Sequence, residues 1–212
     1  MSLKVCEVFA SIQGESTHAG MPCAFVRLSG CNLRCRWCDT TYAYDNGLER
    51  EIDELAAEAL AFGLPLVELT GGEPLLQAET PALAERLLCA GVTVLVETNG
   101  SQDISVLPEA AIAIVDMKGP SSGEATRMDT ANLDRLRPRD EVKFVIGGRE
   151  DYAHMLSLLP RINTLRNVVN ASPLYGALPP ATLVQWIVAD RLPVRLNLQQ
   201  HKYIWPPETR GV

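Results

Sequence analysis

A chain of 212 residues with 47% hydrophobic residues is long enough for one domain with a full core, so we expect a single domain over residues 1–212 rather than a disordered or fibrous protein. The sequence contains no apolar run long enough to cross a membrane, and its first residues lack the apolar stretch of a signal peptide. The net charge of −7 argues against broad contact with a nucleic-acid backbone, which requires lysine and arginine to neutralise phosphates.

Strands and helices are predicted to alternate along most of the chain. Strands are predicted at residues 5–9, 24–28, 66–70, 92–98, 111–116, 141–146, 167–171 and 194–198. Helices are predicted at 51–62, 80–90, 130–136, 150–159 and 180–189, with a turn at 45–47. This alternation implies right-handed βαβ units, and the chain is shorter than the roughly 250 residues of a closed eightfold barrel. We therefore expect an α/β fold with a mainly parallel sheet that forms a partial, incomplete TIM-like barrel.

Polar residues follow most of the predicted strands. They lie at 70–73, 97–99, 116–118, 172–175 and 199–201. Because the carboxyl ends of parallel strands meet on one face, where active sites of such folds lie, we expect these groups to converge.

Three cysteines within eight residues, Cys31, Cys35 and Cys38, are the strongest chemical signal. Thiolates suit iron–sulfur clusters and zinc. A four-iron cluster normally takes four cysteines, so three would leave one iron open for substrate or cofactor. The spacing alone does not choose the metal, and a non-enzymatic zinc or electron-transfer module stays an alternative. Six cysteines without a signal peptide indicate a reducing compartment, and we expect the cytoplasm.

The residues around these cysteines resemble a known family. Residues 30–40 look like the cluster signature of the radical S-adenosylmethionine (SAM) enzymes. Residues 12–15, 20–22, 25–27 and 38–40 together resemble the 7-carboxy-7-deazaguanine synthase family of the queuosine (7-deazapurine) pathway. The resemblance covers nearly the whole chain and implies a reduced radical-SAM core. It also implies a [4Fe-4S] cluster on Cys31, Cys35 and Cys38, with SAM on the fourth iron.

The resemblance assigns further residues to SAM. Gly72 and Glu73 match the Gly-Gly-Glu segment that contacts the methionyl amino group in these enzymes. Asp116 and Lys118 offer a hydrogen-bond acceptor for a ribose and a charge for a carboxylate. The predicted SAM contacts are Trp37, Cys38, Asp39, Gly72, Glu73, Asp116, Met117, Lys118, Ser172, Pro173, Leu174 and Tyr175.

The substrate side is expected around Arg27, which stands in an otherwise apolar predicted strand and suits a substrate carboxylate. Groups of residues 12–15 could match the alternating donors and acceptors of a pterin edge. The predicted substrate contacts are Ile12, Gln13, Gly14, Glu15, Arg27, Thr70, His201 and Val212. In the resembled family the chain terminus reaches the substrate, and a threonine matching Thr40 binds Mg²⁺ together with it.

The implied activity converts 6-carboxy-5,6,7,8-tetrahydropterin to 7-carboxy-7-deazaguanine by hydrogen abstraction at C6, ring contraction and loss of ammonia. The alternative within the superfamily is an activating enzyme that makes a glycyl radical on a partner protein. The expected partners are a small-molecule pterin and a reductant such as a flavodoxin, and a homodimer is common among relatives. For residues 119–129 the sequence allows two interpretations, a mobile loop over the site or a disordered segment.

Overall fold

A computed structural model of the protein describes residues 1–206 and 209–212. The elements in chain order are β1 (Ser2–Ile12), β2 (Pro22–Leu28), β3 (Leu48–Glu51), α1 (Ile52–Ala61), β4 (Leu66–Gly71), α2 (Thr80–Cys89), β5 (Thr93–Thr98), β6 (Ile112–Asp116), α3 (Asn132–Arg135), β7 (Glu141–Ile146), α4 (Arg149–Leu158), β8 (Val168–Pro173), α5 (Pro180–Ala189), β9 (Arg195–Leu196) and α6 (His201–Ile204). Within these residues no helix is long and apolar enough to cross a membrane.

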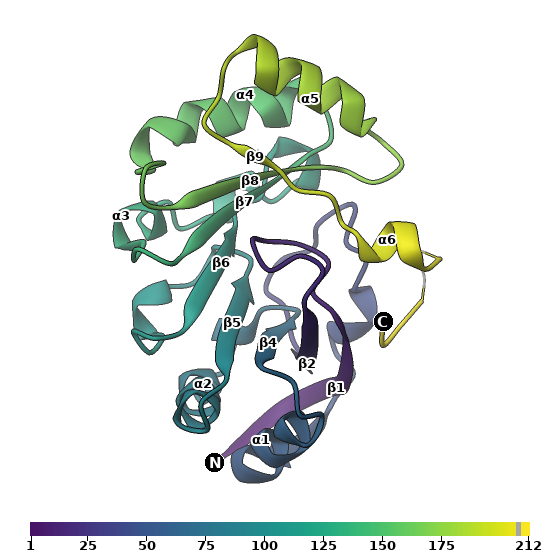
Figure 1. Ribbon diagram of the computed structural model, residues 1–212, viewed down its shortest axis with the longest axis vertical. Coiled ribbons are helices and arrows are strands. Elements are labelled where there is room, and N and C mark those ends of the chain that lie inside the picture. The colour runs from purple at the N-terminus through teal and green to yellow at the C-terminus, as the bar shows by residue number, and fades with distance from the viewer. Residues whose placement is uncertain (207–208) are drawn as a thin grey trace.

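The described strands form one sheet in the order β3-β1-β2-β4-β5-β6-β7-β8-β9. From β2 to β9 all neighbours run parallel, whereas β1 runs antiparallel to both β2 and β3. In Figure 1 the strands curve round from β1 to β9 as an open arc, and the segment after β1 lies inside it. This arrangement confirms the expected partial barrel with a mainly parallel sheet.

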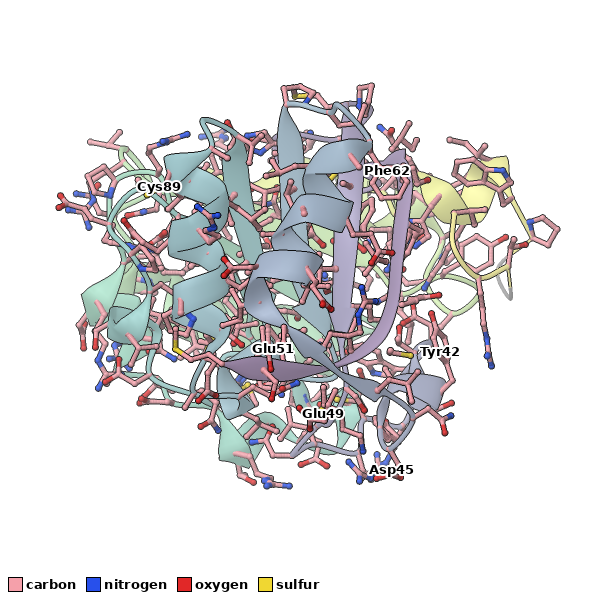
Figure 2. All side chains as sticks on the ribbon, turned by 90° about the horizontal axis from the view of Figure 1, so that it is seen from below. Tyr42, Asp45, Glu49, Glu51, Phe62 and Cys89 are labelled. Atoms are coloured by element: carbon pink, nitrogen blue, oxygen red, sulfur yellow. The ribbon has the colours of Figure 1, made fainter. Side chains whose placement is uncertain are left out.

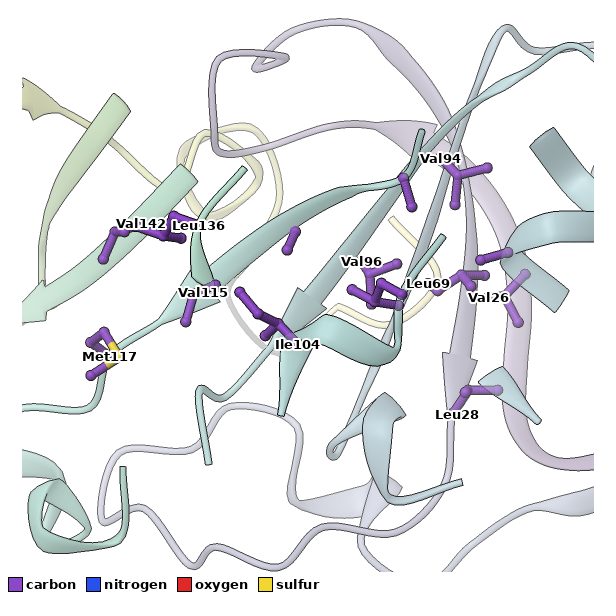
Figure 3. Packing of buried hydrophobic residues seen from close by; sticks show 14 of the residues in the cluster. Val26, Leu28, Leu69, Val94, Val96, Ile104, Val115, Met117, Leu136 and Val142 are labelled. Carbon is purple, nitrogen blue, oxygen red and sulfur yellow. The ribbon is translucent and has the colours of Figure 1, made fainter. Parts of the chain in front are cut away.

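Alternate residues of the parallel strands build the main core on the outer, helix-covered face of the sheet. Val26, Leu69 and Val96 are fully buried in this core, and Figure 3 shows several such strand residues with Ile104 and Leu136. Helices α1 and α2 lie next to each other over this face in Figure 2, where Phe62 marks the end of α1. Burial of aliphatic side chains on both sides of each strand explains why these strands are almost continuously apolar.

The inner face is divided along the strands. Toward the amino ends it carries a smaller apolar cluster that includes Phe25, Leu95 and Ile114. Toward the carboxyl ends the same inward positions become charged, as with Glu97, which follows Leu95 by two residues. Because side chains two residues apart point to the same face of a strand, charged residues lie next to this apolar cluster on the inner face. They lie at the carboxyl ends of the strands, where the site was expected.

The sequence missed two elements and misplaced some boundaries. β3 is polar and mostly exposed, and it forms because its backbone pairs with the edge of β1, from Ser2↔Glu51 to Val5↔Leu48. α6 is four residues long and was predicted only as a polar segment. β1 is longer than expected at both ends, and β9 is shorter.

The segment at 119–129 packs against the cysteine loop and contains two short 3-10 turns. Within it, Ser122 is buried, and the Ser121 hydroxyl accepts a hydrogen bond from the Trp37 indole at 3.0 Å.

Candidate active site

A cavity of about 230 Å³ lies at the carboxyl ends of the strands and gathers most of the predicted site residues. Those that line it are Ile12, Gln13, Gly14, Glu15, Arg27, Cys31, Cys35, Trp37, Cys38, Asp39, Thr40, Thr70, Gly72, Asp116, Lys118, Leu174, His201 and Val212. Tyr175 instead lines an adjoining groove, together with Leu174. Glu73, Met117, Ser172 and Pro173 are buried beside the cavity without lining it.

The cysteine loop follows β2 and is held by backbone contacts to two neighbouring segments. The Glu73 amide donates to the Gly30 carbonyl at 2.8 Å, and the Arg36 amide donates to the Ser122 carbonyl at 3.0 Å. A Cβ at Gly72 would stand 2.1 Å from the Gly30 oxygen, so this close approach requires glycine. The absence of a side chain at Gly72 therefore lets the cysteine loop lie this close to the end of β4.

The three thiols are free, partly buried and turned to the same cavity. Burial raises the pKa of Cys35 to about 11, and burial also raises the pKa of Cys31. A metal binds the thiolate form, so binding at this site would release protons from these thiols. Among the described residues, no group of three or more histidines, cysteines or acids is arranged to hold a single metal ion. Three thiols around an open cavity fit a cluster with three protein ligands and one exchangeable position.

Glu73 does not present its carboxylate to the cavity. Its oxygens accept hydrogen bonds from the Leu75 amide at 2.9 Å, the Thr98 hydroxyl at 2.8 Å and the Asn99 amide at 2.6 Å. The Asn99 side chain in turn approaches the Cys31 sulfur at 3.8 Å. In this structure Glu73 ties the ends of β4 and β5 together, and its glycine neighbour faces the site.

The two carboxylate oxygens of Asp116 differ in their contacts, because Oδ2 is paired with two lysines. Its Oδ2 accepts from Lys118 at 2.8 Å and lies 3.2 Å from the Lys143 ammonium. Burial opposes ionisation, but the two lysines hold the pKa of Asp116 below its ordinary value. Oδ1 is buried and has no hydrogen-bond partner among the described residues. Buried polar atoms are rarely left unpaired, so this oxygen suits a ligand hydroxyl, such as that of a ribose.

Lys143 is the electrostatic centre of the inner wall, and the sequence analysis missed it. Its ammonium donates to Glu15 at 2.8 Å and also binds Glu97. Burial alone would lower the pKa of Lys143, but its carboxylate neighbours, with Asp116 and Glu15 foremost, raise it well above the ordinary value. Burial raises the pKa of Glu97, whereas Lys143 lowers the pKa of Glu15 against the effect of burial. One buried cation thus joins β5, β6 and β7 to the segment after β1.

Gln13 and Glu68 form a second buried contact that was not predicted. The Gln13 amide nitrogen donates to Glu68, and the Gln13 oxygen accepts from the Glu15 amide at 2.8 Å. Burial and the nearby Glu97 raise the pKa of Glu68 well above its ordinary value. Glu68 therefore fixes which way the Gln13 amide faces the cavity.

Arg27 lines the cavity as predicted, but its guanidinium is already paired. Its Nε donates to Glu7 at 2.7 Å, and Glu7 also accepts from the Tyr42 hydroxyl at 2.9 Å. The guanidinium carbon lies 5.7 Å from the Phe9 ring centre and 5.9 Å from that of Tyr42. The terminal nitrogens remain donors for a ligand carboxylate.

The end of the chain covers the open side of the barrel. The Gln200 amide donates to the Gly14 carbonyl at 2.9 Å, and His201 packs so closely on Gly14 that an added Cβ would stand 2.2 Å from its Nδ1. Burial lowers the pKa of His201. Lys202 binds Asp39 at 2.6 Å, while Thr40 donates to the other Asp39 oxygen at 2.9 Å.

The missed residues share one signal that the sequence did contain. Glu97 was among the polar residues expected to converge, whereas Glu68 and Lys143 are charged residues with apolar neighbours on both sides within their strands. Such a residue must find a partner, and parallel strands place it on the inner face two positions from an apolar neighbour. Tyr42, Lys202 and Arg210 line the cavity from loops and the C-terminal segment, and no local pattern marked them.

Comparison with known proteins finds curated relatives that match nearly the whole chain. The family profile of the Radical SAM superfamily matches residues 25–170. The 7-carboxy-7-deazaguanine synthase of Koribacter versatilis is 43% identical over 228 residues, which covers 99% of this chain and 100% of that protein. The protein of the same name from Chlorobaculum tepidum is 45% identical, covering 99% and 97%. The crystal structure of QueE from Escherichia coli has the same fold, with a TM-score of 0.81, 23% identity and 95% of each chain covered.

Proposed function

The chain belongs to the 7-carboxy-7-deazaguanine synthase family of the radical SAM superfamily, and from that premise we propose its reaction. It converts 6-carboxy-5,6,7,8-tetrahydropterin to 7-carboxy-7-deazaguanine with loss of ammonia, as a step of queuosine biosynthesis. One observation carries the proposal. Three free thiols, the Arg27 guanidinium and Asp116, whose Oδ1 has no partner among the described residues, line the same cavity.

Cys31, Cys35 and Cys38 would hold a [4Fe-4S] cluster. When bound, the cluster and SAM supply the carbon-centred radical that removes a hydrogen atom from the pterin. Asp116 would accept a hydrogen bond from the SAM ribose, and Lys118 would offset negative charge beside it. Gly72 would let the backbone approach the methionyl group, with Glu73 supporting that turn from behind.

Arg27 would bind the substrate carboxylate, and residues 12–15 would orient the pterin edge. Gln13 and Glu15 support this assignment because each is held in one orientation, Gln13 by Glu68 and Glu15 by Lys143 and Gln199. Thr70 and His201 line the same cavity. Thr40 would bind Mg²⁺ together with the substrate, because magnesium keeps several waters and takes substrate oxygens.

We further propose how the protein as a whole is organised and where it acts. Its main hydrophobic core extends from β1 to α5, which supports one domain over residues 1–212. We also propose the cytoplasm as the compartment, a flavodoxin-type reductant as the electron donor and a homodimer as the assembly. The six cysteines, which are all free in the structure, support the first of these. An activating enzyme would need a groove that admits a protein loop; the cysteines, Asp116 and Arg27 instead all line the cavity of about 230 Å³ rather than the adjoining groove alone, and this favours a small molecule.

The test is anaerobic reconstitution with iron and sulfide, followed by reduction in the presence of SAM, Mg²⁺ and 6-carboxytetrahydropterin. Mass spectrometry should detect 5′-deoxyadenosine and 7-carboxy-7-deazaguanine together. Deoxyadenosine without the deazaguanine would keep the radical class and refute the substrate. Absence of both from protein with a full complement of iron would refute the class.

A further inference from the structure

The cavity is separated from the adjoining groove, of about 680 Å³, by side chains that line both spaces. Asp39 and Tyr42 come from the loop after the cysteines, whereas Lys202 and Arg210 come from the C-terminal segment. Two contacts cross this wall. Lys202 binds Asp39 at 2.6 Å, and the Arg210 guanidinium carbon lies 4.0 Å from the centre of the Tyr42 ring. Figure 2 shows Tyr42 on the side of the molecule where the C-terminal segment lies.

Two guanidinium groups, those of Arg27 and Arg210, lie against the Tyr42 ring. Arg27 and Glu7 form a neutral pair at 2.7 Å, and the Tyr42 hydroxyl donates to the same carboxylate oxygen. Burial raises the pKa of Tyr42 to about 12, so the phenol stays protonated and neutral. The Arg210 guanidinium therefore lies against the ring of a neutral tyrosine, and Arg27 contacts the same ring.

Arg27 alone is a weak anchor for a carboxylate because Glu7 already neutralises it. A carboxylate arriving at its terminal nitrogens would also face the negative charge of Glu7. A guanidinium stacked on an aromatic ring keeps the N–H groups along its edge available, and its planar fork matches a carboxylate. Arg210 is such a group, because it stacks on the Tyr42 ring, against which Arg27 also lies.

We propose that Arg210 is a second carboxylate-binding residue, which acts together with Arg27 to select and hold an anionic pterin. The inference deepens the proposed function and depends on it. Because Arg210 lines both spaces, a ligand that enters from the groove meets this guanidinium before it meets Arg27. The substrate carboxylate is then bound by both guanidinium groups.

The test compares the binding of two oxidised pterins that do not turn over. Reconstituted holoenzyme with SAM and Mg²⁺, without reductant, is dialysed to equilibrium against 6-carboxypterin or unsubstituted pterin, and free ligand is measured by its fluorescence. Arg210→Gln should weaken 6-carboxypterin binding by about tenfold or more, the range expected for hydrogen bonds to a charged group, and should leave pterin binding within about twofold. Arg210→Lys keeps the charge but loses the fork, and should lose less.

Arg149→Gln is the matched control, because Arg149 lies 3.9 Å from the Trp186 ring centre, away from the residues that line the cavity. It should bind both pterins as the wild type does. Tyr42→Phe keeps the ring under Arg210 and should retain most of the preference for 6-carboxypterin, whereas Tyr42→Leu should lose it.

Three outcomes would overturn the inference. Unchanged affinity of Arg210→Gln for 6-carboxypterin would show that Arg27 suffices, and equal losses for both pterins would show that Arg210 only supports the wall. A wild-type enzyme with no preference for the carboxylated ligand would instead refute the proposed substrate, and with it the role of Arg210. Iron content and circular dichroism of each variant show that the fold is kept.

Discussion

Replacing Lys143 with methionine should destabilise the protein strongly, because three carboxylates share its ammonium. The Lys143 side chain is 5% exposed, and those of Glu15 and Asp116 are 11% and 7% exposed. Breaking a buried ion pair by removing one partner typically costs about 3–5 kcal/mol. The cost should not triple, since Glu15 keeps Gln199 at 2.8 Å and Asp116 keeps Lys118 at 2.8 Å. Of the three carboxylates, Glu97 should therefore be destabilised most when the Lys143 ammonium is removed.

We therefore expect Lys143→Met to lower the free energy of unfolding by about 3–5 kcal/mol, which corresponds to roughly 6–20 °C in Tm for a domain of this size. Equilibrium urea unfolding of the apoprotein, followed by circular dichroism, measures the loss at pH 7. The loss should shrink toward pH 5, because the unpaired carboxyls then take up protons. Adding Glu97→Gln should recover part of it, on the order of 1–3 kcal/mol.

Lys4→Met is the control, because within the described part of the chain the Lys4 ammonium donates only to the exposed Asp45 carbonyl, at 3.1 Å. It should change stability by less than about 0.5 kcal/mol. A loss below about 1 kcal/mol in Lys143→Met, or no recovery with Glu97→Gln, would refute the view that this lysine is the charge centre of the inner wall.

Three further changes probe the site. Cys35→Ala should abolish SAM cleavage, and cleavage by a variant with a full, intact cluster would contradict the ligand assignment. Gly72→Ala should cost about 1–3 kcal/mol and reduce the iron bound, because its Cβ would stand 2.1 Å from the Gly30 oxygen and 2.8 Å from the Cys31 Cβ; urea unfolding and iron analysis would detect both effects. Burial raises the pKa of Glu68, so the wild type loses stability as pH rises from about 4.5, the ordinary pKa, through this raised value. Glu68→Gln mimics the protonated form, so its stability relative to wild type should increase between pH 5 and pH 8, and a constant difference would refute the shift.

The sequence was most informative where a pattern is local. Apolar runs and turn residues located the parallel strands to within a residue or two, since burial on both faces makes such strands visibly apolar. β3 was missed because its side chains are exposed and polar, and its backbone pairing with β1 leaves no trace in composition. Short helices such as α6 likewise depend on the contacts around them.

The site divided in the same way. The cysteine loop and Gly72 could be predicted because glycine and cysteine have few substitutes in these roles. The inner-wall ion pairs could have been suspected from Lys143 alone, a lysine between Val142 and Phe144. The partners of Lys143 could not be predicted, because Glu15, for example, lies 128 residues away along the chain. The orientation of Glu73 away from the cavity was also beyond the sequence, since it depends on two amides and a hydroxyl in neighbouring segments.

The contact between the segment after β1 and the end of the chain also bears on how the protein folds. Gln199 reaches Glu15 across 184 residues, and Arg195 reaches the Ser16 carbonyl across 179. Closing so long a loop has an entropic cost that local pairings do not share, and contacts of this range slow folding. We expect the pairing of β2, β4 and β5 to form early and the cover over the cavity to form last. The cysteine thiols would then stay accessible to an incoming cluster until the final step of folding.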